Sequence, residues 1–348
     1  MKRLRLQSIL ILILTFAFSC NLPETTVTNI VHRDGSVIRK LEIRNSSNNF
    51  NVSDIQVPLD STWIIRDSME VSVKGDTSWV RRAEKLYKNA DGITKDYQAD
   101  SGANRQISRH AEFRKRFRWF NTRYRFSEII DKKMNRGFPI TDFLSGDELE
   151  WFYSPDNFTS QKKTGPDSLK YKALSDTVQK KTEKWMFKCL VSEIISEFER
   201  LTSGKEDSGF LADSLKAHEN ELIRLLIGDD QKIDSLWSNG ILLQRFSGRE
   251  DAVKFLADAD SAVSLALDNI FIDFREYTVR TIMPGKLTAT NGFIDSSDMV
   301  LWPVKSEYFL TQKYEMYAES QVRNIWACIL TGVFILFVLA GVILKRKS

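Results

Sequence analysis

The sequence predicts an α+β protein in which a discontinuous antiparallel β domain, built from N- and C-terminal strands, carries a helical-bundle insertion and is followed by a C-terminal transmembrane helix. Three observations lead to this prediction. β-rich segments with turn signals occupy both ends of the chain, and apolar residues recur at helical spacing in the middle. Twenty uncharged residues at 325–344 then precede a cationic tail. A lone set of C-terminal strands is marginally stable, so we expect it to complete the N-terminal sheet.

The predicted boundaries divide the chain into five parts. These are a lipoprotein signal peptide at 1–19, the N-terminal part of the β domain at 20–138, the helical insertion at 139–273, the C-terminal strands of the β domain at 274–322, and the transmembrane helix with its tail at 323–348. With 42% hydrophobic and 28% charged residues, the composition is globular and sufficient for a core.

The first twenty residues have the pattern of a bacterial lipoprotein signal. Three cations precede an apolar run at 9–18 that is too short to cross a hydrocarbon core about 30 Å thick. Residues 17–20, AFSC, resemble a lipobox, so we expect Cys20 to become the lipidated first residue, carrying acyl chains such as palmitate. The alternatives are an ordinary signal peptide with a chance cysteine, or an uncleaved anchor.

The first ordered segment predicts a β-hairpin turned by Asp34-Gly35-Ser36. Strands are expected at 68–73 and 79–87, with a short helix or turn at 89–97. The segment 110–131 fits either a helix or two strands, and its aromatic content favours an antiparallel pair with a bend at Asn121-Thr122.

The segment from about 168 to 273 is predominantly helical by its apolar spacing, and about four helices would hide those apolar faces. Two of them are expected at 211–227 and 230–246. Beyond 273, three strands are broken by Pro284-Gly285 and Asn291-Gly292, and a last alternation at 314–318 runs into the membrane helix.

The tail after the apolar segment fixes the expected topology. Its cations Lys345, Arg346 and Lys347 place it in the cytoplasm by the positive-inside rule. A signal peptide demands the same orientation, so the bulk of the chain is expected on the periplasmic side of the cytoplasmic membrane. The net charge of +4 includes six cations in the signal and the tail, which leaves −2 for the part between. Nucleic-acid binding therefore has no support from global charge.

Three short motifs carry a resemblance to a known group: TVTNIVHRDGSVIRKLEI near the start, TIMPGKLTATNG followed by MVLWPV, and YAESQVRN before the apolar segment. Their order resembles the LppM-type extracytoplasmic domain and uncharacterised membrane-anchored lipoproteins of the Bacteroidota kind. The resemblance covers about a third of the chain. It implies a membrane-tethered module of the cell envelope with envelope lipid or glycolipid binding as a role, and it brings no catalytic residue.

Motifs for catalysis or metal binding are missing from the sequence. It contains no HExxH, CxxC, Walker, GxGxxG or GxSxG pattern, and the three histidines, His32, His110 and His218, share no spacing typical of a metal site. Cys189 stands in an apolar helical stretch and is expected to be a core residue rather than a nucleophile. We therefore expect no catalytic residue, no metal and no cofactor.

One local feature suggests binding. The stretch 105–126 interleaves arginines with aromatic residues, a combination that suits phosphate-bearing headgroups or acidic polymers. The candidate ligand-binding residues are Arg114, Arg116, Arg118, Trp119, Arg123 and Tyr124. The competing interpretation is a strand with one charged outer face and one aromatic core face.

These observations predict a membrane-anchored extracytoplasmic lipoprotein that acts as a non-enzymatic binding or assembly module of the cell envelope. Its expected partners are the membrane and either an envelope lipid or another envelope protein. The first alternative is a lipid- or anionic-ligand-binding protein that uses the stretch 105–126. The second is a periplasmic hydrolase, which is disfavoured because no nucleophile and base can be placed together.

Overall fold

The computed structural model describes residues 24–50, 55–71, 77–100, 107–134, 137–154, 168–206, 208–227, 239–270, 274–295 and 297–347. The protein is a mixed α+β protein, as the sequence predicts. The chain divides into two compact units. We call them the β unit, formed by Pro23–Ile130, Glu276–Val304 and Glu315–Ser348, and the helical unit, which contains Asp131–Arg275 and Lys305–Tyr314.

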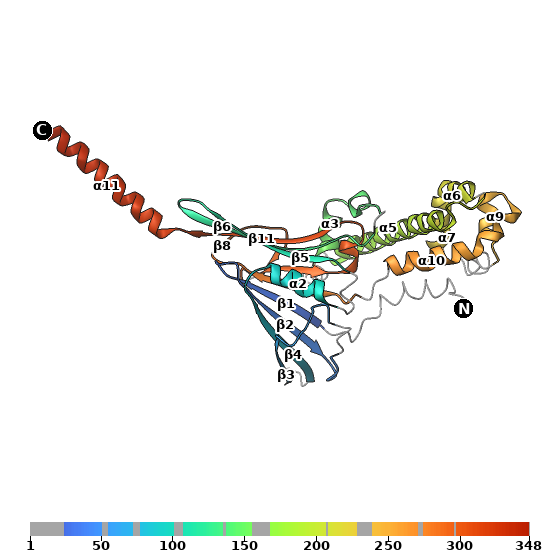
Figure 1. Ribbon diagram of the computed structural model, residues 1–348, viewed down its shortest axis with the longest axis horizontal. Coiled ribbons are helices and arrows are strands. Elements are labelled where there is room, and N and C mark those ends of the chain that lie inside the picture. The colour runs from blue at the N-terminus through green and yellow to red at the C-terminus, as the bar shows by residue number, and fades with distance from the viewer. Residues whose placement is uncertain are drawn as a thin grey trace. The chain divides into compact units, whose positions relative to one another are not determined.

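The β unit contains two sheets (Figure 1). The seven-stranded sheet has the order β3-β4-β2-β1-β7-β10-β9, and the four-stranded sheet has the order β5-β6-β11-β8. The strands are β1 (Glu24–Val31), β2 (Val37–Asn45), β3 (Ile64–Val71), β4 (Thr77–Tyr87), β5 (Arg109–Phe117), β6 (Asn121–Ile130), β7 (Tyr277–Ile282), β8 (Lys286–Thr290), β9 (Phe293–Ile294), β10 (Val300–Val304) and β11 (Tyr314–Arg323). A short helix, α2 (Asp91–Ala99), follows β4.

Strands β1 and β2 form the hairpin that the sequence predicts. Their register pairs Val31 with Val37, and alternate residues along both strands are buried. Gly35 closes the turn with a φ of +96°, a conformation that favours glycine, and a Cβ there would lie 2.8 Å from the Phe113 ring. The turn of the first sheet therefore packs directly on β5 of the second sheet.

The predicted C-terminal strands do form, but they differ from expectation in direction and placement. β7 pairs with β1 in parallel, so the seven-stranded sheet is not wholly antiparallel. β8 leaves β7 at Pro284-Gly285 and joins the other sheet, where it pairs with β11. Local turn signals cannot reveal either feature, because the partner strands are distant in sequence and the choice depends on which apolar face each strand buries.

The helical unit packs around one long helix, α5 (Ser168–Thr202). Its other elements are η3 (Ile140–Asp142), α3 (Asp147–Tyr153), α6 (Ser208–Ala217), α7 (Glu219–Ile227), α9 (Ile241–Ser247), η4 (Glu250–Phe255), α10 (Leu256–Ile270) and η5 (Ser306–Phe309). The indole of Trp185 is fully buried and donates to the Phe138 carbonyl at 2.7 Å. Cys189 is also fully buried, and burial raises the pKa of its thiol to about 11, which fits the expected core role.

Two details of the helical unit differ from the sequence analysis. The single helix expected at 211–227 is two helices, α6 and α7, which meet at His218. Glu219 and Glu221 occupy the first turn of α7, where acidic side chains favour a new helix start. The helix expected at 230–246 lies partly outside the described residues, and α9 covers its end.

The C-terminal helix α11 (Ile325–Lys347) follows β11 directly (Figure 1). Among the described residues it alone is long and apolar enough to cross a membrane, by length and composition. Its side chains are almost all exposed, whereas a core helix of this composition would be covered.

Candidate functional site: the hairpin beside the apolar helix

Strands β5 and β6 form an antiparallel hairpin, as the sequence analysis favoured, but its turn lies at residues 118–120 and the expected bend at Asn121-Thr122 is the start of β6. The register pairs Arg114 with Arg125 and Arg116 with Arg123. Residues directly opposite each other in a ladder point to the same side, so these four arginines share one face of the hairpin, the arginine face. The other face carries aromatic residues. Two of them, Phe113 and Tyr124, have stacked rings with centroids 6.1 Å apart.

Two members of the arginine face are neutralised by neighbouring carboxylates. Arg125 donates to Glu319 at 2.7 Å and to Glu315 at 2.9 Å, both on β11. Burial lowers the pKa of Arg125, but the hydrogen bonds to these carboxylates outweigh it and leave the pKa above its ordinary value. Arg114 donates to Glu112 at 2.7 Å. In the half of the face farther from the turn, three carboxylates therefore neutralise two arginines.

The half nearer the turn is not balanced. Arg116 and Arg123 oppose each other across the ladder, both are exposed, and neither forms an ion pair within the described part of the chain. The same holds for Arg118 in the turn and for Lys115 on the other face, although the Lys115 ammonium lies 5.9 Å from the centroid of the Tyr124 ring. Like charges placed directly opposite in a sheet destabilise it, so this arrangement costs stability when no anion is present.

The turn that joins the two strands is bonded to the start of α11 through Asn324. The Asn324 side-chain amide donates to the carbonyl of Arg118 at 2.7 Å and to that of Trp119 at 3.2 Å. Its backbone N–H donates to the carbonyl of Phe120 at 2.9 Å, and its side-chain oxygen accepts from the Thr122 hydroxyl at 3.0 Å. One residue thus satisfies three consecutive turn carbonyls and fixes the helix to the hairpin.

Aromatic side chains extend this contact along the helix. The Trp119 indole N–H donates to the Thr331 hydroxyl at 2.8 Å, and its ring lies edge-on to Trp326 with a centroid distance of 5.5 Å. Phe117 stacks on Trp326 at 6.2 Å. Ala327, between these contacts, is fully buried, because its small side chain allows the hairpin to approach the helix closely.

The hairpin tip, residues 117–120, nevertheless keeps a large apolar surface in contact with solvent. Phe117, Trp119, Phe120 and Trp326 remain between 46% and 56% exposed. These rings and the unpaired arginines lie on the same hairpin end, next to the first residue of the apolar helix, Ile325.

The structure divides the six candidate residues into three kinds. Tyr124 is buried on the aromatic face, and Arg114, whose side chain is 73% exposed, is paired with Glu112. Arg116, Arg118 and Arg123 are exposed and have no ion pair in the described residues. Trp119 is exposed at the tip, between Phe117 and Phe120 in sequence. Cys20, the expected lipidation site, lies outside the described residues.

A second polar cluster, buried between the two sheets, was not singled out from the sequence. Arg39 on β2 is fully buried and donates to Glu128 on β6 at 2.9 Å and to the Tyr97 hydroxyl at 2.9 Å. Glu128 also accepts from the Asn29 amide. Burial lowers the pKa of Arg39, but the Glu128 carboxylate outweighs it and leaves the pKa above its ordinary value.

Arg109 on β5 extends this cluster. Its guanidinium donates to the Tyr277 hydroxyl at 2.8 Å and to the Gln56 carbonyl at 3.1 Å. The cluster ties sheet to sheet across the core by charge-assisted hydrogen bonds. A sequence signal for it exists, because Arg39 falls on the inward alternation of β2 together with Val37 and Leu41.

The sequence signal for the hairpin–helix contact is weaker. Trp326 at the start of an apolar segment is typical of a membrane interface, but Asn324 and Thr331 have no motif. Their role depends on the hairpin, which is about two hundred residues away in sequence.

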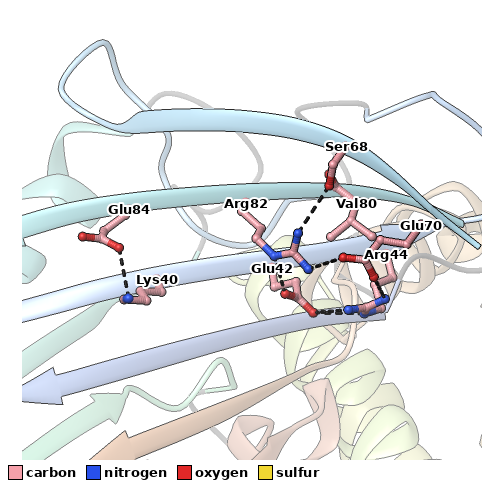
Figure 2. Close-up of polar contacts among 8 residues, drawn as sticks. All are labelled: Lys40, Glu42, Arg44, Ser68, Glu70, Val80, Arg82 and Glu84. Atoms are coloured by element: carbon pink, nitrogen blue, oxygen red, sulfur yellow. Dashed lines mark hydrogen bonds and ion pairs between the residues drawn. The ribbon is translucent and has the colours of Figure 1, made fainter.

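The outer face of the seven-stranded sheet offers a contrast to the hairpin. Figure 2 shows six charged residues of β2, β3 and β4 on this face, each hydrogen-bonded or ion-paired to an opposite charge, whereas Arg66 on β3, opposite Arg82 in the ladder, has no ion pair in the described residues. The pairs are Lys40–Glu84 at 3.1 Å, Arg82–Glu42 at 2.8 Å, Arg82–Glu70 at 2.5 Å, Arg44–Glu70 at 2.7 Å and Arg44–Glu42 at 2.9 Å. We call these six residues the outer ladder.

No group of three or more histidine, cysteine, aspartate or glutamate residues in the described ranges is arranged to hold a metal ion. Comparisons with protein-family models, with curated proteins and with solved structures find no match.

Proposed function

We propose that the protein is a membrane-anchored extracytoplasmic lipoprotein that serves as a non-enzymatic binding or assembly module of the bacterial cell envelope. In this proposal α11 spans the cytoplasmic membrane, its cationic tail is cytoplasmic, and Cys20 adds a lipid anchor in the outer leaflet. The two sheets act as one discontinuous β domain, and the helical unit is an insertion that presents a surface to partners.

The observation that carries the proposal is the attachment of α11 to the β unit. A flexible tether would leave the domain free to reorient, but the bonds of Asn324 to three turn carbonyls hold the helix start on the hairpin. A module held close to one bilayer in a set orientation suits assembly at a membrane. A spanning helix is effectively irreversible, which argues against a carrier that moves between membranes.

The chemistry of the hairpin also favours binding over catalysis. The exposed groups nearest its turn are mainly guanidinium groups and aromatic rings, with the ammonium of Lys115 beside them, and a guanidinium cannot serve as a general base. Such groups bind anions and apolar surfaces. A second function, binding of a lipid or another anionic ligand by the stretch 105–126, is favoured by the unpaired Arg116 and Arg123.

Native mass spectrometry of the full-length protein, gently extracted from its membrane, tests the proposal. We expect the mass of a chain that begins at an acylated Cys20, together with a protein companion at fixed stoichiometry. An unmodified chain that contains residues 1–19 would contradict the lipoprotein assignment. If the protein has no protein companion and converts a substrate, and if changing one polar residue abolishes that conversion, then it is an enzyme rather than an assembly module.

A further inference from the structure

We propose that the tip of the β5–β6 hairpin is a lipid-binding element that enters the membrane interface beside the first two turns of α11, where its unpaired arginines bind the phosphates of anionic phospholipid headgroups. This inference rests on the proposed function in one respect, namely that α11 spans the bilayer. The lipid is that of the bilayer in which the protein is anchored.

The position of the tip follows from its contacts with α11. Thr331, which accepts the Trp119 indole N–H, lies six residues after Ile325. At 1.5 Å per residue, the tip reaches about 9 Å along the helix from its start. A helix of 23 residues spans about 34 Å, so with an apolar core about 30 Å thick the start of α11 lies at one interface. The turn backbone, bonded to Asn324, lies at this level, and the Trp119 side chain extends from it towards the apolar core.

The tip is suited to a medium with little water. In water, a hairpin turn can leave its carbonyls to solvent, whereas in a bilayer each unsatisfied backbone group costs several kcal/mol. Here Asn324 satisfies the carbonyls of Arg118, Trp119 and Phe120. Thr331 satisfies the indole N–H of Trp119. The three carbonyls of the turn and the indole N–H of Trp119 are thus bonded within the protein before any lipid is present.

The exposed rings fit the same location. Trp119 and Trp326 are amphipathic rings of the kind that gathers at headgroup level in membrane proteins, and Phe117 and Phe120 add apolar area beside them. Scattered single apolar residues need no explanation on a protein surface, but these four surround the start of the one helix in the described chain that can cross a membrane.

The cations lie at the height of the headgroups. Arg116 and Arg123 are one ladder step above Phe117 and Thr122, so a strand rise of about 3.3 Å per residue puts them within about 7 Å of the turn. The headgroup layer on each side of a bilayer is about 5 to 8 Å thick. A phosphate between the two guanidinium groups accepts forked hydrogen bonds from both and removes their repulsion. This partner explains a like-charge pair that the protein itself leaves unneutralised.

The test uses the full-length protein in nanodiscs made of phosphatidylcholine with phosphatidylglycerol, from which co-purifying lipids are counted by native mass spectrometry. Near an anionic membrane each arginine contributes about a fivefold preference, so Arg116→Gln with Arg123→Gln should reduce the retention of phosphatidylglycerol over phosphatidylcholine by roughly thirtyfold. The matched control is Lys170→Gln with Lys172→Gln, which removes the same charge from exposed positions of α5 in the helical unit. We expect the control to behave as the wild type.

Equal losses in the two double variants would overturn the proposal, because net charge rather than the hairpin would then select the lipid. Unchanged retention of phosphatidylglycerol by the hairpin variant would also overturn the proposal. Retention of an acidic polymer in place of lipid would overturn it too and would identify another ligand. Hydrogen exchange at β5 and β6 amides verifies that the hairpin variant is folded. If the hairpin does not select anionic lipid, the proposed function still stands, because this test uses purified protein and does not examine whether a protein companion is bound.

Insertion of the tip has an independent readout. Lipids brominated in the acyl chain quench indole fluorescence only at short range, so Trp119→Phe should lower the quenched fraction of the total emission. The control Trp63→Phe removes an indole buried in the β unit and should raise that fraction. If Trp119→Phe does not change the quenched fraction, the tip lies in water and does not insert into the membrane.

Discussion

The outer ladder and the hairpin tip are both exposed strand surfaces rich in arginine, yet they treat charge in opposite ways. On the outer ladder every cation meets a carboxylate across or along the strands, as between Arg82 and Glu42. At the tip Arg116 meets Arg123. On a solvated sheet face, opposite charges across the strands stabilise the sheet. An excess of one charge on a folded surface is instead typical of a surface with an external partner.

The cluster buried between the sheets shows how charge is paired where water is excluded. Between the sheets, where water is excluded, Arg39 has a carboxylate partner and a hydroxyl partner. A guanidinium without hydrogen-bond partners could not remain there, because burying a charge without such partners costs far more than exposing it, and Arg109 beside it is bonded to hydroxyls and a carbonyl. The buried arginines thus have hydrogen-bond partners within the protein, whereas Arg116 and Arg123 have no ion pair in the described residues.

The largest effect is expected in the buried cluster. Glu128→Ala leaves Arg39 charged and without its carboxylate, which should reduce the free energy of unfolding of the β unit by about 3–5 kcal/mol. Denaturant unfolding of the full-length protein in detergent, with hydrogen exchange at the amides of β2, measures this loss. The double variant Arg39→Met with Glu128→Leu should recover most of it. A double variant as unstable as the single one would mean that the ion pair is not the source.

The next effect separates stability from binding at the tip. Arg116→Glu places a carboxylate opposite Arg123, which should raise the stability of the hairpin by about 0.2–1 kcal/mol. The same change should lower the retention of phosphatidylglycerol roughly thirtyfold, since the local charge falls by two. Thermal unfolding and native mass spectrometry measure the two quantities on one sample. Higher stability with unchanged lipid retention would reduce the tip to an ordinary solvated face.

A smaller effect is expected on the outer ladder. Glu42→Gln weakens the ion pairs to Arg82 and Arg44, but exposed pairs contribute little, so the free energy of unfolding should change by less than about 1 kcal/mol. Lipid retention should not change. The measurements are those used for Arg116→Glu, which makes the two sheet faces directly comparable. A loss of lipid binding here would show that the ladder, not the tip, contacts the bilayer.

The smallest effect concerns pH. Hydrogen bonds from Arg82 and Arg44 hold the pKa of Glu70 below its usual value near 4.3. A lowered pKa in the folded state means that its stabilisation is present above the unfolded value and is lost as the pH falls through the folded value. Denaturation midpoints measured between pH 6 and pH 3 should therefore fall slightly less in Glu70→Gln than in the wild type.

The elements of the fold were predictable wherever the pattern is local. The hairpin at Gly35, the strand β4, the helix α2 and the pair β5–β6 were all expected, because alternation and turn residues act over a few neighbours. The parallel pairing of β1 with β7 and the transfer of β8 to the second sheet were not expected. Strand partners are selected by the apolar faces that each strand must bury, and these lie far apart in sequence.

The candidate site was predictable in composition and not in geometry. The sequence alone determines that arginines and aromatic residues are dense at 105–126 and that a long apolar segment ends the chain, since both depend only on residue type. Only the tertiary structure decides that Tyr124 is buried, that Arg114 is paired, and that Arg116 faces Arg123. It alone also brings Asn324 to the turn, because contacts between segments two hundred residues apart arise from the packing of the whole β unit and leave no local pattern.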